Sequence, residues 1–576
     1  MSRTFHVTLV FAFLFLIKSS SVDAQYNPLW IPDTLSGTVF NLNLRDTVKQ
    51  FLPGPSTPTM GINGNWWGPT LFFNKGDTVY MNVMNGLMDT TTLHWHGIHL
   101  PAVMDGGPHQ VIPPMTTWMP YFKVMNNAAT YWYHPHLHMM TEEHVINGLG
   151  GLIIVRDSNE AALNLPRMYG IDDIPLVLSD RRFDTTAGNV NKMLMAHLGD
   201  TMMVNGTLYP EFTVPSQVIR FRILSNALER GYRFGFADST PFSVIATDGG
   251  LLNSPVNITQ TRFTISPGER VEILVNLSGR QGQTLDLIAY NSTLPSDIAG
   301  ASPGIGSFYN KLGGRDFLIL HLNIGPSTGN PVTTFPVTLK NNVFLSAANA
   351  TNTRHIKFTD PPDSLCPNNL IGCGWFDSTF FDINVINYTI NRNAIEIWEL
   401  ENKSDYFSHP FHIHDVQFYI LDRNGAIPPA YERGWKDVVN VRKNQTVRVI
   451  AKFEDFIDSL TPYMYHCHIL YHEDAGMMGQ FVVVDLSVAI NEQNETNNFL
   501  FVYPNPAVDE FTVSSTLFKQ GKNQLKVFDT MGREMFSETM QTFHQTIKVK
   551  EWKDGLYFVQ FANADQFMLK KIVVQH

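Results

Sequence analysis

Short runs of strand-forming residues, each broken by turn-forming residues, extend along almost the whole chain and constrain its fold more than any other feature. Runs rich in Val, Ile, Phe and Thr, such as RVEILVN, VRVIAKF and QFVVVD, are separated by Gly, Pro, Asn and Asp, and little of the chain shows helical periodicity. This pattern is typical of β-sandwiches and barrels. Asn205-Gly206 and Asp248-Gly249-Gly250 are predicted hairpin turns. We therefore expect an all-β protein.

The strand-rich sequence is long enough for several cores. At 576 residues, 44% of them apolar, the chain has room for about four domains. Three blocks of comparable size are predicted at 26–165, 166–328 and 329–487, and histidine-rich motifs occur only in the first and third. Residues 488–498 are polar and lack aromatic side chains, which predicts a linker. Residues 499–576 contain strand-like runs such as GLYFVQF and are expected to form a separate small unit.

Residues 1–24 have the features of a secretory signal peptide. Arg3 precedes an apolar run from Val7 to Ile17, and Ala24 ends a cleavage site of small residues. Because the apolar run is too short for a transmembrane anchor, we expect an exported protein with no membrane-spanning segment. The net charge of −11 gives no basic field that would attract phosphate, so nucleic acid is not an expected partner.

The chain has only three cysteines. Cys366 and Cys373, in CPNNLIGC, would close a small disulfide loop in an oxidising compartment, and this leaves Cys467. An isolated buried cysteine is usually an inert apolar residue. Cys467, however, stands between two histidines in MYHCHILYHEDAGMMG.

Histidine pairs with one residue between them occur in four places. In an extended strand, side chains two positions apart share a face, so each pair can direct two imidazoles at one point. The pairs are His94 with His96, His134 with His136, His412 with His414, and His466 with His468. Eight imidazoles are too many for one ion, and we expect a cluster of several metal ions where the first and third blocks meet. For any single pair, a position on the surface or in the core is the alternative.

The same alternation predicts a second metal centre. Cys467 faces away from its two flanking histidines, and His409, three residues before His412, likewise faces away from that pair and can meet Cys467. His472 and Met477 follow shortly after the cysteine. Two histidines, a thiolate and a distant methionine are the ligands of a blue copper site. A three-histidine zinc site is the alternative, but it would need neither the cysteine nor the methionine.

At these motifs the sequence resembles the multicopper oxidases. The segments LHWHGIHL, YWYHPHLHMM, HPFHIH and HCHILYHEDAGMM carry the resemblance, which extends over about residues 30–485 through stretches such as MDGGPHQVIPP, SPGERVEILV and GWKDVV. The resemblance implies three cupredoxin-like Greek-key β-sandwich or barrel domains. For the small C-terminal unit we expect a separate β-sandwich domain. The resemblance also implies four copper ions, namely one of type 1, one of type 2 and two of type 3, with O2 as the electron acceptor.

Carried over motif by motif, the resemblance implies a role for each ligand. Type 1 copper would be bound by His409, Cys467, His472 and Met477. Type 2 copper would be bound by His94 and His412. The type 3 pair would be bound by His96, His134, His136, His414, His466 and His468. Electrons from a small-molecule donor would then pass from Cys467 through its two neighbours to the other three ions.

Three carboxylates are further candidates for function. Glu473 and Asp105 match positions that the family uses in proton delivery, with structural hydrogen bonding as the alternative. Asp405 would lie where electrons enter, with a turn residue as the alternative.

The resemblance also bears on the electron donor. Cuprous-oxidase members carry a Met-rich insertion and a methionine two residues before HPFHIH, where this chain has Phe407 and no such insertion. We therefore favour a laccase-like enzyme acting on phenols or aromatic amines. A metal (cuprous) oxidase, a non-catalytic copper-sequestering protein and a copper nitrite reductase are the alternatives.

The terminal unit resembles the C-terminal sorting domain of the type IX secretion system. The PNP turn in YPNPAVDEFTV and the strand pattern around Lys553-Asp554-Gly555-Leu556-Tyr557 carry this resemblance. It implies interaction with the secretion machinery and a secreted or cell-surface protein exported through the periplasm. A small carbohydrate-binding or adhesion module is the alternative.

Overall fold

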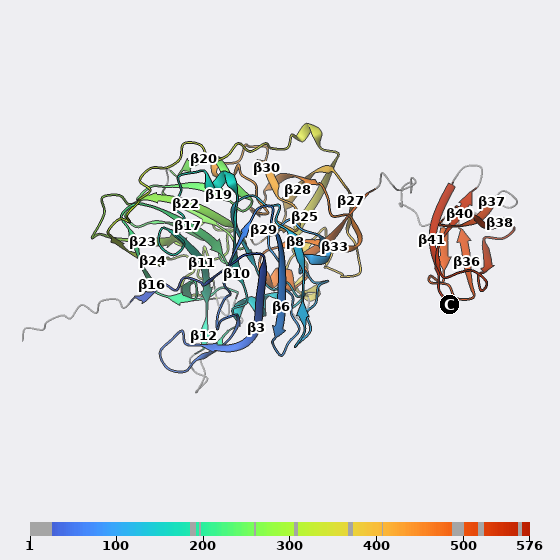
Figure 1. Cartoon of the computed structure of the whole chain (residues 1–576), viewed down its shortest axis with the longest axis horizontal. Coiled ribbons are helices and arrows are strands. Elements are labelled where there is room, and N and C mark those ends of the chain that lie inside the picture. The colour runs from blue at the N-terminus through green and yellow to red at the C-terminus, as the bar shows by residue number, and fades with distance from the viewer. Residues whose placement is uncertain are drawn as a thin grey trace, which may run out of the picture. The chain divides into compact units, whose positions relative to one another are not determined.

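The computed structural model of the chain describes most of the residues that follow the predicted signal peptide (Figure 1). The described residues are 26–576 except 185–191, 195–196, 259–260, 305–308, 367–372, 406, 486–499, 516–522, 531 and 563–566. The predicted signal peptide and the predicted linker therefore lie outside the described residues.

Regular structure in the described residues is almost entirely β, which confirms the expected fold class (Figure 1). The α-helices are short: α1 (Thr141–Ile146), α2 (Ser158–Ala161) and α3 (Leu470–Asp474). Among the described helices, none is long and apolar enough to cross a bilayer. The chain separates into a unit that ends at Val484 and a second unit from Asp485 to His576.

The first pair of sheets packs around a core formed by residues such as Phe40, Leu71 and Ile153. One sheet has the order β4 (Thr57–Ile62), β3 (Val39–Lys49), β6 (Thr78–Gly86), β7 (Thr117–Trp118), with β8 (Tyr121–Lys123) also on β6. The other has the order β2 (Thr34–Ser36), β5 (Thr70–Asn74), β10 (Gly151–Arg156), β9 (Ala129–Tyr133). Strand β3 buries alternate residues because only one of its faces meets the core.

The second pair of sheets packs around Ile174, Phe234 and Leu320. One sheet has the order β15 (Thr207–Leu208), β14 (Thr201–Val204), β11 (Asp173–Arg181), β17 (Val218–Ser225), β22 (Arg270–Asn276), β19 (Phe242–Thr247), β20 (Gly250–Asn257). The other has the order β1 (Asn27–Pro28), β16 (Pro210–Pro215), β24 (Asp316–Gly325), β23 (Thr284–Tyr290), β18 (Tyr232–Phe236), β21 (Phe263–Ile265). A separate ribbon joins β12 (Phe183–Asp184) to β13 (Lys192–Met193).

The third pair of sheets packs around Ile356, Phe411 and Phe481. One sheet has the order β26 (Trp375–Phe376), β25 (Asn352–Thr359), β28 (Ala394–Asn402), β32 (Thr446–Phe453), β30 (Phe418–Arg423). The other has the order β27 (Tyr388–Asn391), β34 (Met478–Val484), β33 (Asp458–Cys467), β29 (His409–Ile413), β31 (Val438–Val441). Near this pair, Cys366 and Cys373 form a disulfide.

The C-terminal unit has its own core, with Phe511, Val527 and Val559 at its centre. One sheet has the order β35 (Leu500–Tyr503), β36 (Glu510–Ser515), β39 (His544–Lys548). The other has the order β38 (Glu534–Met540), β37 (Asn523–Asp529), β40 (Gly555–Ala562), β41 (Phe567–Val574). The exact limits of the four domains remain predictions.

Both predicted hairpin turns are confirmed. Val204 pairs with Thr207 across Asn205 and Gly206, whose φ values of 50° and 74° suit a two-residue turn of type I′. Thr247 pairs with Gly250, so β19 and β20 are joined through Asp248 and Gly249.

A buried ionic cluster holds strand β9 against the second core. Arg222 pairs with Asp173 at 2.7 Å and with Glu272 at 2.7 Å, and Thr130 of β9 donates its hydroxyl to Glu272. Because β9 leads directly into the His134 motif, this cluster helps to position that motif.

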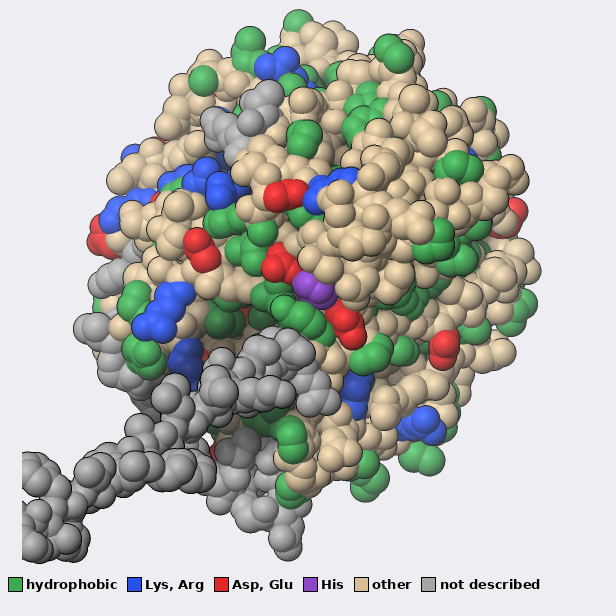
Figure 2. Space-filling model, turned by 90° about the vertical axis from the view of Figure 1, so that its left-hand side faces the viewer, with side chains coloured by type: hydrophobic (Ala, Val, Ile, Leu, Met, Phe, Trp, Pro, Cys, Tyr) green, Lys and Arg blue, Asp and Glu red, His purple; other side chains and the backbone are tan. Residues whose placement is uncertain are grey.

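On the face seen in Figure 2, acidic and basic side chains are interspersed rather than gathered by sign.

Candidate metal centres

Strand pairing brings the four histidine pairs together. In the register of β29 and β33, His412 lies opposite His466 and Phe411 lies opposite Cys467. His94 and His134 form an antiparallel bridge with backbone hydrogen bonds of 2.8 and 3.1 Å. Because directly opposed residues share a face, His412 and His466 point to one side of their sheet and Cys467 to the other.

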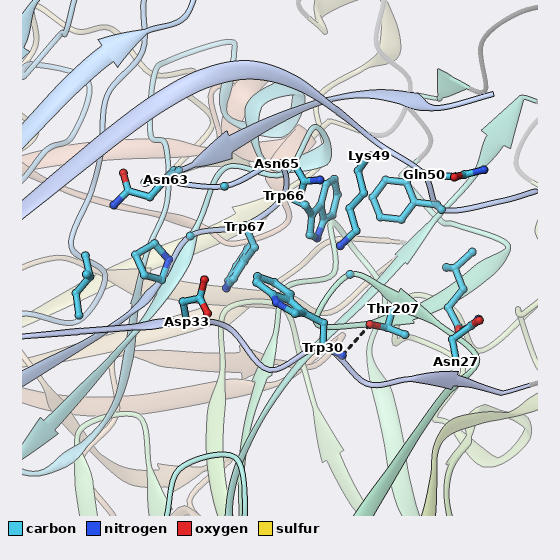
Figure 3. Close-up of a pocket in the computed structure, with 18 residues that line it drawn as sticks. Asn27, Trp30, Asp33, Lys49, Gln50, Asn63, Asn65, Trp66, Trp67 and Thr207 are labelled. Atoms are coloured by element: carbon cyan, nitrogen blue, oxygen red, sulfur yellow. Dashed lines mark hydrogen bonds between the residues drawn. The ribbon is translucent and has the colours of Figure 1, made fainter. Parts of the chain in front are cut away.

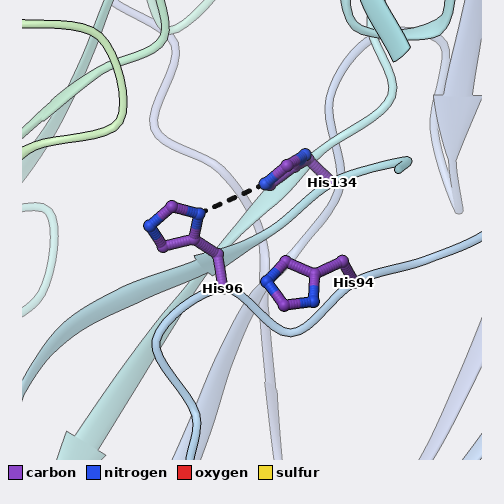
Figure 4. Close-up of side chains that lie close together, drawn as sticks. All are labelled: His94, His96 and His134. Atoms are coloured by element: carbon purple, nitrogen blue, oxygen red, sulfur yellow. Dashed lines mark hydrogen bonds between the residues drawn. The ribbon is translucent and has the colours of Figure 1, made fainter. Parts of the chain in front are cut away.

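The eight histidines of the pairs are buried and form one set, called here the eight-histidine cluster. His96 Nδ1 lies 3.3 Å from His134 Nε2, the contact drawn as a dashed line in Figure 4, and His94 lies beside them. His136 Nε2 lies 3.2 Å from His466 Nε2. Within three subsets, the possible ligand atoms lie within 4.8 Å of one another: His94 with His96 and His134, His94 with His412 and His414, and His136 with His414 and His466.

Hydrogen bonds on the outer side of the rings fix where the protons lie. His94 Nδ1 donates to Asp105 O at 2.9 Å, His412 Nδ1 to Asp437 O at 2.8 Å and His134 Nδ1 to Pro135 O at 2.8 Å. Each of these rings therefore turns the lone pair of Nε2 toward the cluster.

Two further rings follow the same pattern, whereas His96 and His468 differ from it. His414 Nδ1 donates to Asp105 Oδ2 at 2.7 Å and His466 Nδ1 to Cys467 O at 3.1 Å. His96 is reversed, because its Nε2 donates to Asp437 Oδ1 at 3.2 Å and leaves Nδ1 facing His134. Neither ring nitrogen of His468 has a hydrogen-bond partner.

This arrangement fits bound metal ions. With protons on the outer nitrogens, the inner contacts of 3.2 and 3.3 Å bring lone pairs together, and a cation would satisfy them. Burial holds the pKa of His96, His134, His136 and His412 well below the ordinary value and lowers the pKa of His414 and His468 to about 3. These six rings are therefore neutral near neutral pH, the form in which imidazole binds metals.

A second buried set, called here the cysteine set, lies on the other side of strand β33. Cys467 Sγ is 3.5 Å from His409 Nδ1 and 3.5 Å from His472 Nδ1. The backbone of Met477 bonds to both neighbours, since its N–H donates to His472 O at 2.8 Å and its carbonyl accepts from Cys467 N–H at 3.1 Å. Burial raises the pKa of the Cys467 thiol, so a bound cation is needed to hold it as a thiolate. One thiolate, two imidazoles and a thioether suit copper.

Two of the predicted carboxylates touch the eight-histidine cluster. Asp105 contacts His414 at 2.7 Å and His94 at 3.3 Å. Glu473 lies 3.2 Å from both His136 Nδ1 and His466 Nδ1. The third, Asp405, is not brought to the ligands in this way. It is exposed on the segment that precedes His409, and its backbone N–H donates to Asp360 at 2.6 Å.

Sequence reasoning missed the buried ion pair beside the cluster. Arg270 makes two hydrogen bonds to Asp437, at 2.5 and 2.6 Å, and Asp437 also accepts from His96. Both residues lie in stretches that carry the family resemblance, SPGERVEILV and GWKDVV, but no pattern within either stretch indicates that they meet. Trp132, which stacks on His134 at 4.1 Å, was also missed, although it precedes the motif by only two residues.

A glycine of the second block lies against the eight-histidine cluster. Gly268 has φ +80°, and a Cβ there would lie 2.7 Å from the His468 ring. A side chain would therefore both strain the backbone and displace a candidate ligand.

Comparisons with known proteins agree with this geometry. Residues 44–160 and 347–487 match models of the multicopper oxidase family, and residues 501–575 match that of the secretion system C-terminal sorting domain. A multicopper oxidase, Mco, of Staphylococcus haemolyticus is 33% identical over 451 residues, which cover 77% of this chain and 88% of the relative. The cell division protein FtsP of Escherichia coli is 29% identical over 473 residues, covering 81% and 94%.

A solved structure agrees as well. The laccase-like multicopper oxidase CueO of the lignin-degrading bacterium Ochrobactrum sp. has a TM-score of 0.70 and 33% identity, and the match covers 79% of this chain and 100% of that one. The chain therefore belongs to the multicopper oxidase family, copper-dependent oxidoreductases of cupredoxin-like fold, and it carries a secretion sorting domain at its C-terminus.

Proposed function

We propose that this chain is an exported laccase-like oxidase with four copper ions. It removes one electron from each of four phenol or aromatic amine molecules, and the four electrons with four protons reduce one O2 to two molecules of water. The observation that carries the proposal is the peptide connection between the two sets. Cys467, which contacts His409 and His472, is bonded directly to His466 and His468 of the eight-histidine cluster.

We assign the ligands as the resemblance of the motifs to the family suggests. The type 1 ligands are His409, Cys467, His472 and Met477; the type 2 ligands are His94 and His412; the type 3 ligands are His96, His134, His136, His414, His466 and His468. When bound, copper supplies the one-electron redox chemistry at both sets. The chain's own contribution is to orient the imidazoles, several of them through hydrogen bonds on their outer nitrogens, and to link the sets through one short covalent path.

Proton delivery is assigned to Asp105 and Glu473. Each carboxylate contacts two histidines of the cluster, as described above, so each lies within reach to pass a proton to the site of water formation. Against the effect of burial, the neighbouring histidines lower the pKa of both carboxyls, so each is ionised at rest and would carry a proton only during transfer. These contacts also orient the imidazoles. We propose both roles for both residues.

Aromatic side chains beside the cysteine set favour an aromatic donor. The half-buried rings of Trp375 and Phe380 lie 5.2 Å apart, and Phe380 packs against Ala475, between His472 and Met477. Such rings offer a stacking surface to a flat phenol. Exposed Asp405 would attract a protonated amine. The Ochrobactrum relative is described as active towards lignin model compounds and lignosulfonate, which supports this donor class.

Copper loading followed by an oxygen assay tests the proposal. We expect about four coppers per chain, a blue absorption band, and oxygen uptake that depends on a phenol or aromatic amine. Cu(I) is assayed alongside. If Cu(I) alone drives uptake, the enzyme is a metal oxidase, and if copper binds without any uptake, the protein sequesters copper; either result overturns the proposal.

We also propose that the C-terminal unit directs export, because residues 501–575 match the sorting domain. A chain that stops at Val484 should accumulate in the periplasm, whereas the full chain should reach the cell surface or medium. Cell fractionation and immunoblotting measure where each chain accumulates. Equal export of the two chains would contradict this role.

A further inference from the structure

A cavity of about 620 Å³ opens on the first unit, on the side of its N-terminal segment (Figure 3). It is lined by residues near Asn27 to Leu35, by the end of β3, by the turn at 62–69 and by the β14–β15 turn. Its volume lies within the range of small-molecule sites. None of the copper ligands proposed above lines it.

Aromatic rings form the walls of this cavity. Phe51 meets Trp66 edge-on, with ring centroids 5.0 Å apart, and Trp30 lies across from them (Figure 3). The ammonium of Lys49 points between these rings, 5.1 Å from the centroid of Trp30 and 5.3 Å from that of Phe51. Such walls suit the faces of a six-membered ring.

Two hydrogen-bond donors in the cavity have no partner among the described residues. No carboxylate pairs with Lys49 in that part of the chain, and burial lowers the pKa of Lys49 to about 8. Trp67 is 2% exposed and its indole Nε1 is buried with no acceptor. An occupant with an anionic acceptor group would pair with the half-buried ammonium of Lys49 and would be stabilised here.

The backbone around these donors is held in uncommon conformations. Trp67 has φ 57° and Asn63, in the same turn, has φ 58°. A bulky residue in this region is an outlier, and such strain tends to occur at ligand sites. Gly206 also lines the cavity. A Cβ there would lie 2.3 Å from the Trp66 ring and 3.2 Å from Lys49 Nζ, so a side chain at this position would displace both.

We propose that this cavity binds a small hydroxylated ring that carries a carboxylate. The ring lies against Trp30 and Phe51, and its carboxylate pairs with Lys49. A hydroxyl group of the ring donates to the carboxylate of Asp33, which also lines the cavity. Both phenolic acids and hexuronic acids have this chemistry.

The binding site is independent of the proposed oxidase reaction. Trp67 belongs to the same buried cluster as Trp132, which stacks on His134, so a layer of packed side chains lies between the cavity and the eight-histidine cluster. Binding is therefore measured without turnover, and its failure would leave the oxidase proposal untouched.

Calorimetric titration of the full copper-loaded chain under anaerobic conditions tests this inference. The probes are 4-hydroxycinnamate and galacturonate, with 4-hydroxybenzyl alcohol and galactose as neutral counterparts. We expect one of the two acids to saturate the protein and its neutral counterpart to bind at least tenfold more weakly, which also identifies the source of the ligand.

Variants separate this cavity from the donor site of the oxidase. Lys49→Met keeps the apolar stem and should weaken binding of the acid about tenfold or more. Lys123→Met is the matched control, because Lys123 is exposed on strand β8 and does not line the cavity. This variant should bind the acid as tightly as the parent does. If neither acid binds, or if Lys49→Met binds as tightly as Lys123→Met, the inference is wrong.

Discussion

The ion pair between Arg270 and Asp437 allows a prediction whose size follows from the structure. Asp437→Asn keeps the shape of the side chain but removes the charge that pairs with Arg270 through two hydrogen bonds of 2.5 and 2.6 Å. Both residues are at most 1% exposed, so the guanidinium is left without its main counter-charge. Breaking a buried pair costs about 3–5 kcal/mol. Because Asp248 remains 3.8 Å from Arg270 as a second counter-charge, we expect the free energy of unfolding to fall by about 3 kcal/mol, the lower end of this range.

The same substitution should weaken one copper set and spare the other. Asp437 holds the proton of His96 on Nε2, and an amide no longer requires that tautomer. Loss of such an orienting group lowers metal affinity about 10- to 100-fold. We therefore expect a chelator to remove copper from the eight-histidine cluster of the variant while the blue band of the cysteine set persists.

Denaturant titration of the copper-free protein and chelator titration of the loaded protein measure the two effects. Asp286→Asn is the control, because Asp286 pairs with His321 at 2.6 Å but is 37% exposed, and its loss should cost at most about 1 kcal/mol. If Asp437→Asn is no less stable than Asp286→Asn, or if it loses the blue band first, the reasoning about the buried pair is wrong.

Three further substitutions test other parts of the site. Cys467→Ser should lose the blue band and oxygen uptake but keep copper at the eight histidines, and a coloured, active variant would contradict the assignment. Gly268→Ala should destabilise the chain by about 1–3 kcal/mol and lower the copper content, because the residue has φ +80° and its Cβ would lie 2.7 Å from His468. Burial raises the pKa of Glu229 from 4.5 to about 7, so the folded chain keeps a proton that the unfolded chain releases. Stability from this group is present below about pH 4.5 and is lost as the pH rises through about 7. Glu229→Gln should therefore flatten the fall in denaturation midpoint between pH 5 and 7, and an unchanged slope would refute the shift.

Local patterns predicted those features that depend on neighbouring residues. The all-β class follows from period-2 runs and turn residues, and the Asn205-Gly206 turn follows from the need for positive φ at both positions. The closeness of Cys467 and His409 follows from counting positions along two strands, since an odd separation reverses the face.

Features that depend on distant segments had no such signal. Arg270 and Asp437 are separated by 167 positions in the sequence. From the sequence alone, each would be predicted to be a solvent-exposed charged residue. The cavity beside Trp67 likewise combines four segments from two blocks, and its unsatisfied donor becomes visible only when the burial of the indole is known. Interactions between distant segments can therefore be assessed only from the structure, whereas the face to which a strand residue points can be predicted from the sequence.

The alternation along β33 also gives the two copper sets different surroundings. Cys467 and Met477 lie in the apolar core of the third pair of sheets, among side chains such as Phe411 and Ile413. His412 and His466 face the other way, toward imidazoles and the carboxylates Asp105 and Glu473. Under the proposed function, the apolar shell around Cys467 would limit solvent access and tune the redox potential, whereas the polar side supplies hydrogen bonds to the imidazoles and would supply protons for O2 reduction. In that proposal, one strand would separate electron entry from proton entry while keeping the two sites one peptide bond apart.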